Sequence, residues 1–283
     1  MTQDRPPSLH WSRHARQWSR VGQTLRPGPE DIAHYTQTLM ALRATLPGAV
    51  LHRALLLGVT PEIAGLPWPE ETFLTAIDLA LPMIENVWPG NDARRGAVRA
   101  DWLAMPFADT RFDFIVGDGC LALLDYPQDW RRFAGELRRC LRYDGACILR
   151  TFCRPPSGDD TRVADVAAAL RAGRISSFHA FKWRLAMALQ GDDTARGIAL
   201  VDIHKAFQAM IPRRTALAEK LGWPLAEIDS IDAYRENPAR LHFPTLDEIR
   251  AVFVADFETS THRAGHYELA ECCPHLLLRP HRD

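Results

Sequence analysis

Short apolar runs alternate with amphipathic stretches over the first half of the chain. Residues 81–88 and 130–141 place apolar side chains at helical spacing, and Pro82 suits the start of the first of these helices. Five other runs of apolar residues have the length and composition of buried strands, at residues 53–58, 72–78, 98–100, 112–117 and 146–153. This alternation predicts an α/β fold, doubly wound, with a mainly parallel sheet and helices on both faces.

The end of the chain follows a different pattern. Thr245 and Glu248 form a capping box, which predicts a helix that runs to about Val254. Residues 257–262 and 267–278 then read as two strands joined by Arg263-Ala264-Gly265. We therefore expect a seven-stranded sheet that ends in a C-terminal antiparallel hairpin.

We expect one domain over residues 1–283, with two further helical regions. One precedes the first strand and the other lies between two strands. Residues 1–48 predict a helical cap, helical from 8 to 46 except where Pro27-Gly28-Pro29 interrupts it; Trp11 and Trp18 would pack on the main domain or cover a ligand. Residues 155–240 predict a helical insertion between strands 5 and 6, with helices at 161–172, 178–190, 195–211 and 212–221. Its aromatic and basic cluster at 178–183 is expected to pack in the core, or to supply His179 as a base for an acceptor.

Composition narrows the class of partner. The chain has 283 residues, 47% hydrophobic content and a net charge of −1, so no global field favours nucleic acid or an anionic membrane. No apolar run approaches the roughly 20 residues of a membrane span. The first 11 residues are polar and lack an apolar signal core, so a cytoplasmic location is expected.

Cysteine and histidine spacing argues against a metal site. The six cysteines form no C-x-x-C pair and are expected to be buried free thiols in a reducing compartment. His262 and His266 are separated by a glycine-containing stretch that reads as a turn rather than one face of a helix. We expect no bound metal.

The loop after the first strand is a candidate ligand site. Gly58 ends the strand, Thr60 suits an N-cap and Pro61 suits the first helical position. A strand that turns through glycine into a helix is where doubly wound folds bind nucleotides. The loop has one glycine, and Glu62 in the first turn would repel a pyrophosphate but attract a cationic ligand. Alternatively, Glu62 only complements the helix dipole.

A longer stretch resembles the middle of a class I S-adenosylmethionine-dependent methyltransferase. It contains Met105-Pro106-Phe107, then Phe112-Asp113, and it ends in Gly117-Asp118-Gly119. With its flanking segments the resemblance covers residues 50–153 and 243–279. The family's first loop has an acidic residue two positions before its first glycine and two further glycines, where this chain has Leu56, Thr60 and Glu62.

The resemblance implies a set of residues that bind S-adenosylmethionine. Asp78 follows Gly58 by 20 residues, the offset of a carboxylate that accepts hydrogen bonds from ribose hydroxyls, although an acidic residue also commonly ends a strand. Asp118 would contact the ligand ammonium or the substrate, or would cap the next segment. The implied cofactor-binding residues are Gly58, Thr60 and Glu62; Asp78 and Leu79 beside ribose and adenine; Asp101 and Trp102 beside adenine; and Asp118 and Gly119 beside the methionine part.

The predicted function is methyl transfer from S-adenosylmethionine to a small-molecule acceptor. The degenerate first loop leaves open a non-catalytic S-adenosylmethionine-binding protein, and the nucleotide-type loop leaves open an NAD-dependent oxidoreductase. An ordinary dinucleotide dehydrogenase would more often continue with parallel units than with a terminal hairpin. Beyond the alternative role of His179, the sequence indicates no catalytic base, and it indicates no oligomeric state.

Overall fold

The computed structural model describes residues 12, 15–16, 18–22, 24–46, 48, 50–155, 162–262 and 265–281. Its centre is a seven-stranded sheet in the order β3-β2-β1-β4-β5-β9-β8. Strands β1 to β5 pair in parallel, and β9 runs antiparallel to both β5 and β8. The predicted mainly parallel sheet with a C-terminal antiparallel pair is therefore confirmed. The strands are β1 (Arg53–Leu57), β2 (Phe73–Asp78), β3 (Arg95–Arg99), β4 (Phe112–Asp118), β5 (Leu141–Arg150), β8 (Phe257–His262) and β9 (His275–Pro280).

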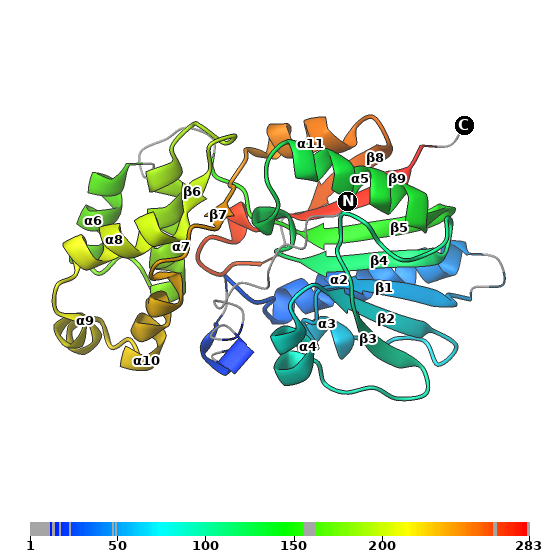
Figure 1. Ribbon diagram of the computed structural model, residues 1–283, viewed down its shortest axis with the longest axis horizontal. Helices are drawn as coiled ribbons and strands as arrows, with labels where there is room; N and C mark the ends of the chain where they lie inside the picture. Colours follow the sequence, from blue (N-terminus) through cyan, green and yellow to red (C-terminus); the bar gives the residue numbers. More distant parts are fainter. Residues whose placement is uncertain are drawn as a thin grey trace.

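Helices cover both faces of the sheet (Figure 1). The strand β1 shows why: Leu55 and Leu57 pack against one group of helices, while Ala54 and Leu56 pack against the other. One face is covered by α5 (Gln128–Cys140) and α11 (Leu246–Phe253), and the other by α2 (Pro29–Thr45), α3 (Pro61–Ala64) and α4 (Leu81–Val87). The capping box of Thr245 and Glu248 starts α11 as predicted.

The helical insertion lies beside the sheet in Figure 1 and has an apolar core of its own. Phe178, Phe181 and Phe207 are buried in this core, which extends through Phe152 and Phe243 to the main domain. Its elements are α6 (Val163–Arg171), α7 (Phe178–Gln190), β6 (Ile198–Ala199), α8 (Leu200–Met210), α9 (Arg214–Leu221), α10 (Leu225–Ile228), the 3-10 helix η4 (Asp229–Tyr234) and β7 (Arg240–Leu241). No helix in the described ranges is both long and apolar enough to cross a bilayer.

Several predicted boundaries in the insertion were wrong. Residues 195–211 were expected to be one helix, but β6 pairs with β7 before α8 begins. Gly197 has a φ of +59°, and a Cβ there would lie 2.6 Å from the carbonyl oxygen of Leu241, so this close strand contact requires glycine. The helix expected from Pro212 begins two residues later, and α10 and η4 had not been predicted.

Strand boundaries shifted as well. The third strand begins at Arg95 rather than Val98, and the fifth runs over Leu141–Arg150 instead of 146–153. Residues 143–145 lie inside β5, where the register with β4 is irregular and Gly145 approaches the carbonyl oxygen of Asp113. The final strand begins after Pro274, not at Tyr267, because residues 267–273 turn toward the interior and contain the 3-10 helix η5 (Ala270–Cys272).

The N-terminal region matches its prediction only in part. The helix expected over 30–46 is α2, and a 3-10 helix, η1 (Trp18–Arg20), precedes it. Trp18 packs against the sheet face that α2 covers, so its packing role is observed. The early part of the predicted cap, including Trp11, lies outside the described residues.

Candidate functional site

The strand order creates a topological switch at the carboxyl ends of β1 and β4. From β1 the chain continues to β2 on one side, whereas β4 pairs with β1 on the other. Crevices at such points hold ligands in open α/β sheets. The predicted binding residues follow these strand ends: Gly58, Thr60 and Glu62 after β1; Asp78 and Leu79 at β2; Asp101 and Trp102 after β3; and Asp118 and Gly119 at β4.

Three of these residues, from three strand ends, come together. Gly58 has a φ of +89°, and its N–H donates to the carbonyl of Ile77 at 2.7 Å. A Cβ at Gly58 would lie 3.9 Å from the Trp102 ring and 4.0 Å from Oδ2 of Asp78. The Trp102 indole donates to the Ile77 carbonyl at 3.0 Å, which holds the ring in place. Backbone, carboxylate and aromatic ring therefore face one small space.

The Asp78 carboxylate is a strong hydrogen-bond acceptor in a poorly solvated position. Its Oδ1 accepts from the backbone N–H of Ala80 at 2.8 Å. Burial raises the pKa of Asp78 to about 6, and the Ala80 hydrogen bond offsets part of that rise. The side chain is thus mainly ionised at neutral pH and suited to a ligand with hydroxyl donors.

The adjacent loop after β3 is stabilised by Asp101. Its Oδ1 accepts from the N–H of Leu103 at 2.9 Å, and the side chain is half-buried. The carbonyl of Leu79, the residue after β2, accepts from Arg99 Nε at 3.1 Å. The predicted contacts of Leu79, Asp101 and Trp102 with adenine stay predictions.

Glu62 already has a cationic partner. Arg26 of the N-terminal segment donates to Glu62 Oε1 through Nε at 2.8 Å and also through Nη2. The other carboxylate oxygen, Oε2, is buried and has no hydrogen-bond partner among the described residues. Thr60 occupies the predicted N-cap position, but its side chain makes no capping hydrogen bond. Glu62 keeps one oxygen for a ligand donor, and its role toward such a ligand stays a prediction.

The same arginine ties the N-terminal segment to the loop after β1. Its guanidinium lies 5.0 Å from the centre of the Trp18 ring and donates to the Trp18 carbonyl at 3.1 Å. A hollow of about 440 Å³ opens beside it, with Trp18 and Arg26 on one side and Asn86 and Val87 of the α4 region on the other. The N-terminal segment therefore forms part of the wall near the predicted ligand site.

At the end of β4, Asp118 makes a contact that the sequence analysis did not consider. Both of its oxygens accept from Arg150, from Nε at 2.5 Å and from Nη2 at 3.3 Å. Burial alone would lower the pKa of Arg150, but the Asp118 carboxylate reverses this and raises that pKa well above the usual value. The capping role suggested for Asp118 was wrong, because its carboxylate is used by this ion pair and Cys120 begins η3 (Leu121–Leu123) without a side-chain cap.

The backbone conformation and the close packing at position 119 require a glycine. It has a φ of +65°, and a Cβ would lie 2.8 Å from Cε2 of Phe152. Its N–H donates to the Arg150 carbonyl at 2.9 Å. The absence of a side chain thus lets the Phe152 ring pack against the end of β4, and contact with a ligand there stays a prediction.

A buried polar network surrounds Arg150 and was not predicted from the sequence. Nη1 of Arg150 donates to the Thr24 carbonyl at 3.1 Å and to the Tyr267 hydroxyl at 3.3 Å. Asp31 accepts from that hydroxyl at 3.1 Å and lies 3.0 Å from Nε2 of His275. An arginine at the end of an apolar strand was the available signal, because a buried charge requires partners.

The insertion meets the sheet through aromatic rings. Trp183 of α7 packs edge-on against Phe152 at 5.3 Å and against Phe243 at 5.3 Å. His179, one turn earlier, is buried 3.9 Å from a carboxylate oxygen of Glu227, and its ring packs against Gly22. The packing interpretation of the aromatic cluster is therefore observed, and the role of His179 as a base stays a prediction.

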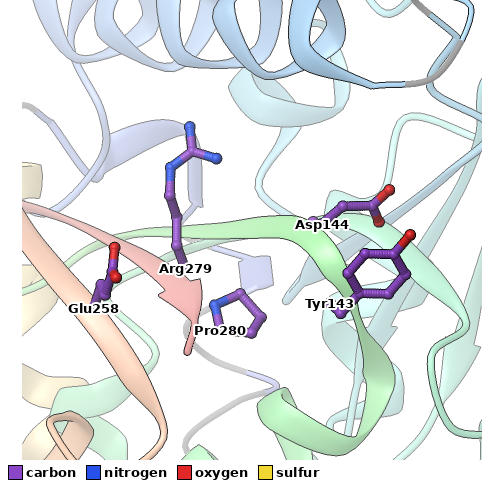
Figure 2. Close-up of a pocket in the computed structure, with 6 residues that line it drawn as sticks. Tyr143, Asp144, Glu258, Arg279 and Pro280 are labelled. Carbon is purple, nitrogen blue, oxygen red and sulfur yellow. The ribbon is translucent and has the colours of Figure 1, made fainter. Parts of the chain in front are cut away.

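A second hollow lies away from this site (Figure 2). It has a volume of about 270 Å³ and is lined by Tyr143, Asp144 and Gly145 of β5 and by Glu258, Arg279 and Pro280 of β8 and β9. The β5 residues belong to the first half of that strand, so this hollow is at the edge opposite the predicted ligand site. Within the described ranges no three potential metal-ligating side chains form a cluster.

Sequence comparison identifies the domain. Residues 62–149 match a family model described as a methyltransferase domain. This segment spans β2 to β5 and includes Asp78, Asp101, Trp102, Asp118 and Gly119. A comparison with curated protein sequences gave no match.

Solved structures with the same fold are distant in sequence. The CcbJ methyltransferase of Streptomyces caelestis has a TM-score of 0.56 and 13% identity, with 98% of this chain and 100% of that one covered. A Rhodobacter sphaeroides protein described as a zinc-dependent alcohol dehydrogenase has a TM-score of 0.56 and 12% identity, with 96% and 98% covered. The PH0226 protein of Pyrococcus horikoshii OT3 has a TM-score of 0.51 and 13% identity, with 94% and 99% covered.

These structural likenesses establish the fold, whereas the family model identifies the kind of domain. The methyltransferase match covers the strands that carry most of the predicted ligand residues. The antiparallel strands β9 and β8 are the last two strands of the sheet. Residues 62–149 are therefore similar to a methyltransferase domain, within a chain whose sheet ends in an antiparallel pair.

Proposed function

We propose that this protein transfers a methyl group from S-adenosylmethionine to a small-molecule acceptor held between the sheet and the helical insertion. The main support for a donor site is the grouping of Gly58, Asp78 and Trp102 at the ends of three strands. It supplies a close backbone approach, a hydroxyl-accepting carboxylate and an aromatic wall within one space.

The residues present fit the donor. Asp78 is an acceptor for ribose hydroxyls, and Trp102 offers an apolar surface for adenine. The unpartnered Oε2 of Glu62 is an acceptor for the donor's ammonium, while Arg26 on Oε1 prevents Glu62 from being an isolated buried charge. When bound, S-adenosylmethionine supplies an electrophilic methyl group.

The acceptor side is formed by the insertion. Trp183 and Phe152 place apolar surface next to Gly119, and the net charge of −1 provides no field for a nucleic acid. Enclosure between the insertion and the sheet would orient the acceptor atom toward the methyl carbon. Such positioning accounts for much of the rate in reactions of this kind.

The donor site is tested by calorimetric titration of the protein with S-adenosylmethionine, S-adenosylhomocysteine and NAD. We expect the two adenosyl ligands to bind and Asp78→Asn to weaken them by about 10- to 100-fold, because a charged acceptor of two hydroxyls is lost. Asp247→Asn is the matched control, since its carboxyl is largely exposed and far from β2 in the chain.

Binding of NAD with no binding of either adenosyl ligand would overturn the proposal. Equal affinity of the wild type and Asp78→Asn for S-adenosylhomocysteine would remove Asp78 from the site. Methyl transfer itself is then followed with radiolabelled donor and a library of small molecules, with release of S-adenosylhomocysteine as the readout.

A further inference from the structure

Lys182 of α7 is a buried cation in unusual surroundings. The residue is 4% exposed. Its Nζ lies 4.9 Å from the ring centre of Tyr234 and 5.9 Å from those of Phe178 and Trp183. Within the described part of the chain, no carboxylate forms an ion pair with it. Aromatic faces attract an ammonium, but they replace only part of its lost hydration.

Other polar atoms in this part of the insertion also lack hydrogen-bond partners among the residues that the structure describes. Nε1 of Trp183, the next residue on α7, is buried without a hydrogen-bond acceptor. Oγ of Ser230, in the same 3-10 helix as Tyr234, is buried and unpartnered too. An indole N–H, an ammonium and a hydroxyl can all donate, so the group that would satisfy them together is an acceptor with several lone pairs. A carboxylate has this property.

This cluster is connected to the donor site through two rings. Trp183 packs edge-on against Phe152 at 5.3 Å. Phe152 in turn lies against Gly119 at the carboxyl end of β4. Trp183 is therefore on the side of the insertion that meets the sheet, and Lys182 is the residue before it on α7, with its Nζ 5.9 Å from the centre of the Trp183 ring.

We propose that Lys182 binds the carboxylate of an apolar organic acid, and that this acid is the methyl acceptor. The inference rests on the proposed function for its second half. The rings of Phe178, Trp183 and Tyr234 would contact the apolar body of the acid, while Lys182 and the Trp183 N–H hold its carboxylate. Neutral apolar compounds and dianionic phosphates fit this arrangement less well, because one lacks the charge and the other adds an uncompensated one.

The test compares acids with their own amides, which have nearly the same shape and no charge. Benzoate, phenylacetate, cinnamate and hexanoate, each beside its amide, are titrated calorimetrically into the protein with S-adenosylhomocysteine present. We expect at least one acid to bind about tenfold or more tightly than its amide, as for a hydrogen bond to a charged group. Lys182→Met should abolish this preference, and Lys205→Met should not, because Lys205 is an exposed lysine on the nearby α8.

A second readout uses the wild type alone. Burial lowers the pKa of Lys182 to about 7, so much of the amine is neutral at pH 8. An anion that pairs with it will restore the charge. Titration at pH 8 in buffers of different ionisation enthalpy should therefore show uptake of about one proton per acid bound. A carboxylate held elsewhere would bind with no such uptake.

The outcomes separate this inference from the proposed function. Donor binding is measured first and by itself, so its absence in the wild type counts against the proposed function. Intact donor binding with equal affinity for every acid and amide overturns the role of Lys182. Preference for an acid that persists in Lys182→Met overturns it as well, and the proton count on the wild type decides the matter if that variant fails to fold.

Discussion

At the scale of single residues, Asp78 shows how a buried carboxyl lowers stability. Burial raises its pKa to about 6, and the backbone N–H of Ala80 is its one hydrogen-bond donor among the described residues. A free carboxyl titrates near 4, so keeping the buried Asp78 carboxylate ionised at neutral pH lowers the free energy of unfolding. A ligand with hydroxyl donors would form hydrogen bonds with this carboxylate and offset the cost of its burial.

This predicts that Asp78→Asn stabilises the protein without ligand. Because the pKa is higher in the folded state than in the unfolded state, the native protein binds more protons between about pH 4 and 6. The contribution of Asp78 to stability is therefore present at low pH and is lost as the pH rises through about 6. Thermal melts should show a higher Tm for Asp78→Asn than for the wild type at pH 8, with a smaller difference at pH 5. A difference that is constant with pH, as expected for the exposed Asp247→Asn, would contradict this.

At the scale of elements, α2 is joined to the sheet by two adjacent side chains. The hydroxyl of Tyr35 donates to the Gly117 carbonyl at 2.8 Å and accepts from the Arg150 N–H at 3.1 Å. It bridges backbone groups of β4 and β5 where these strands end. His34 stacks on His262 of β8 at 3.9 Å and meets His275 of β9 edge-on at 4.8 Å. The helix is thereby attached to both the parallel and the antiparallel part of the sheet.

The histidine contact predicts that the protein loses stability in mild acid. Burial, and then the nearby His275 and His262, lower the pKa of His34 to about 4, although Asp31 acts in the opposite direction. The unfolded chain therefore binds more protons between about pH 6.5 and 4, and the free energy of unfolding falls as the pH is lowered through this window.

Urea denaturation at pH 7.5 and 5 measures this effect. His34→Gln should reduce the difference between the two pH values, because a neutral side chain takes up no proton. His52→Gln provides the comparison, since the His52 ring is exposed. If both variants showed the acid sensitivity of the wild type, the stacked histidines would not be its source.

At the scale of the whole molecule, Arg150 connects distant parts of the chain. It contacts the N-terminal segment at Thr24, β4 at Asp118 and the connection before β9 at Tyr267. Asp31 of α2 lies 3.9 Å from it and binds His275. The side chains of Arg150 and Asp31 are completely buried. Three regions far apart in sequence, around residues 24–31, 118 and 267, therefore depend on one guanidinium.

Arg150→Met should lower the free energy of unfolding by about 3–5 kcal/mol, because it leaves Asp118 buried without its cation. Adding Asp118→Asn in the same chain should recover much of the loss, since the uncompensated charge is gone. Chemical denaturation of the single and double variants measures both effects. Arg250→Met, which removes a partly exposed arginine, should cost no more than about 1 kcal/mol. Equal losses for Arg150→Met and Arg250→Met would show that the network adds little.

The parts of the fold that depend on local pattern were predictable. Buried strands such as β1 and β4 are continuous apolar runs, and Thr245 with Glu248 marks a helix start by chemistry that spans one turn. The strand at residues 267–278 was misplaced because Tyr267 has a long-range role that its neighbours in sequence do not reveal. In the insertion, the short pair β6–β7 joins residues about 40 positions apart, so helical periodicity alone could not indicate it.

The alternation of strands and helices, the family resemblance and the strand ends at which ligand residues would lie could all be read from the sequence alone. These follow from side-chain periodicity and from residues at fixed offsets, such as Asp78 after Gly58. The partners of the charged side chains depend on the tertiary structure. Arg26 pairs with Glu62 and Arg150 with Asp118, whereas Lys182 lies against aromatic rings instead of a carboxylate. Pairings of this kind depend on where segments distant in sequence are brought together, and burial then sets their strength by removing the water that would otherwise screen them.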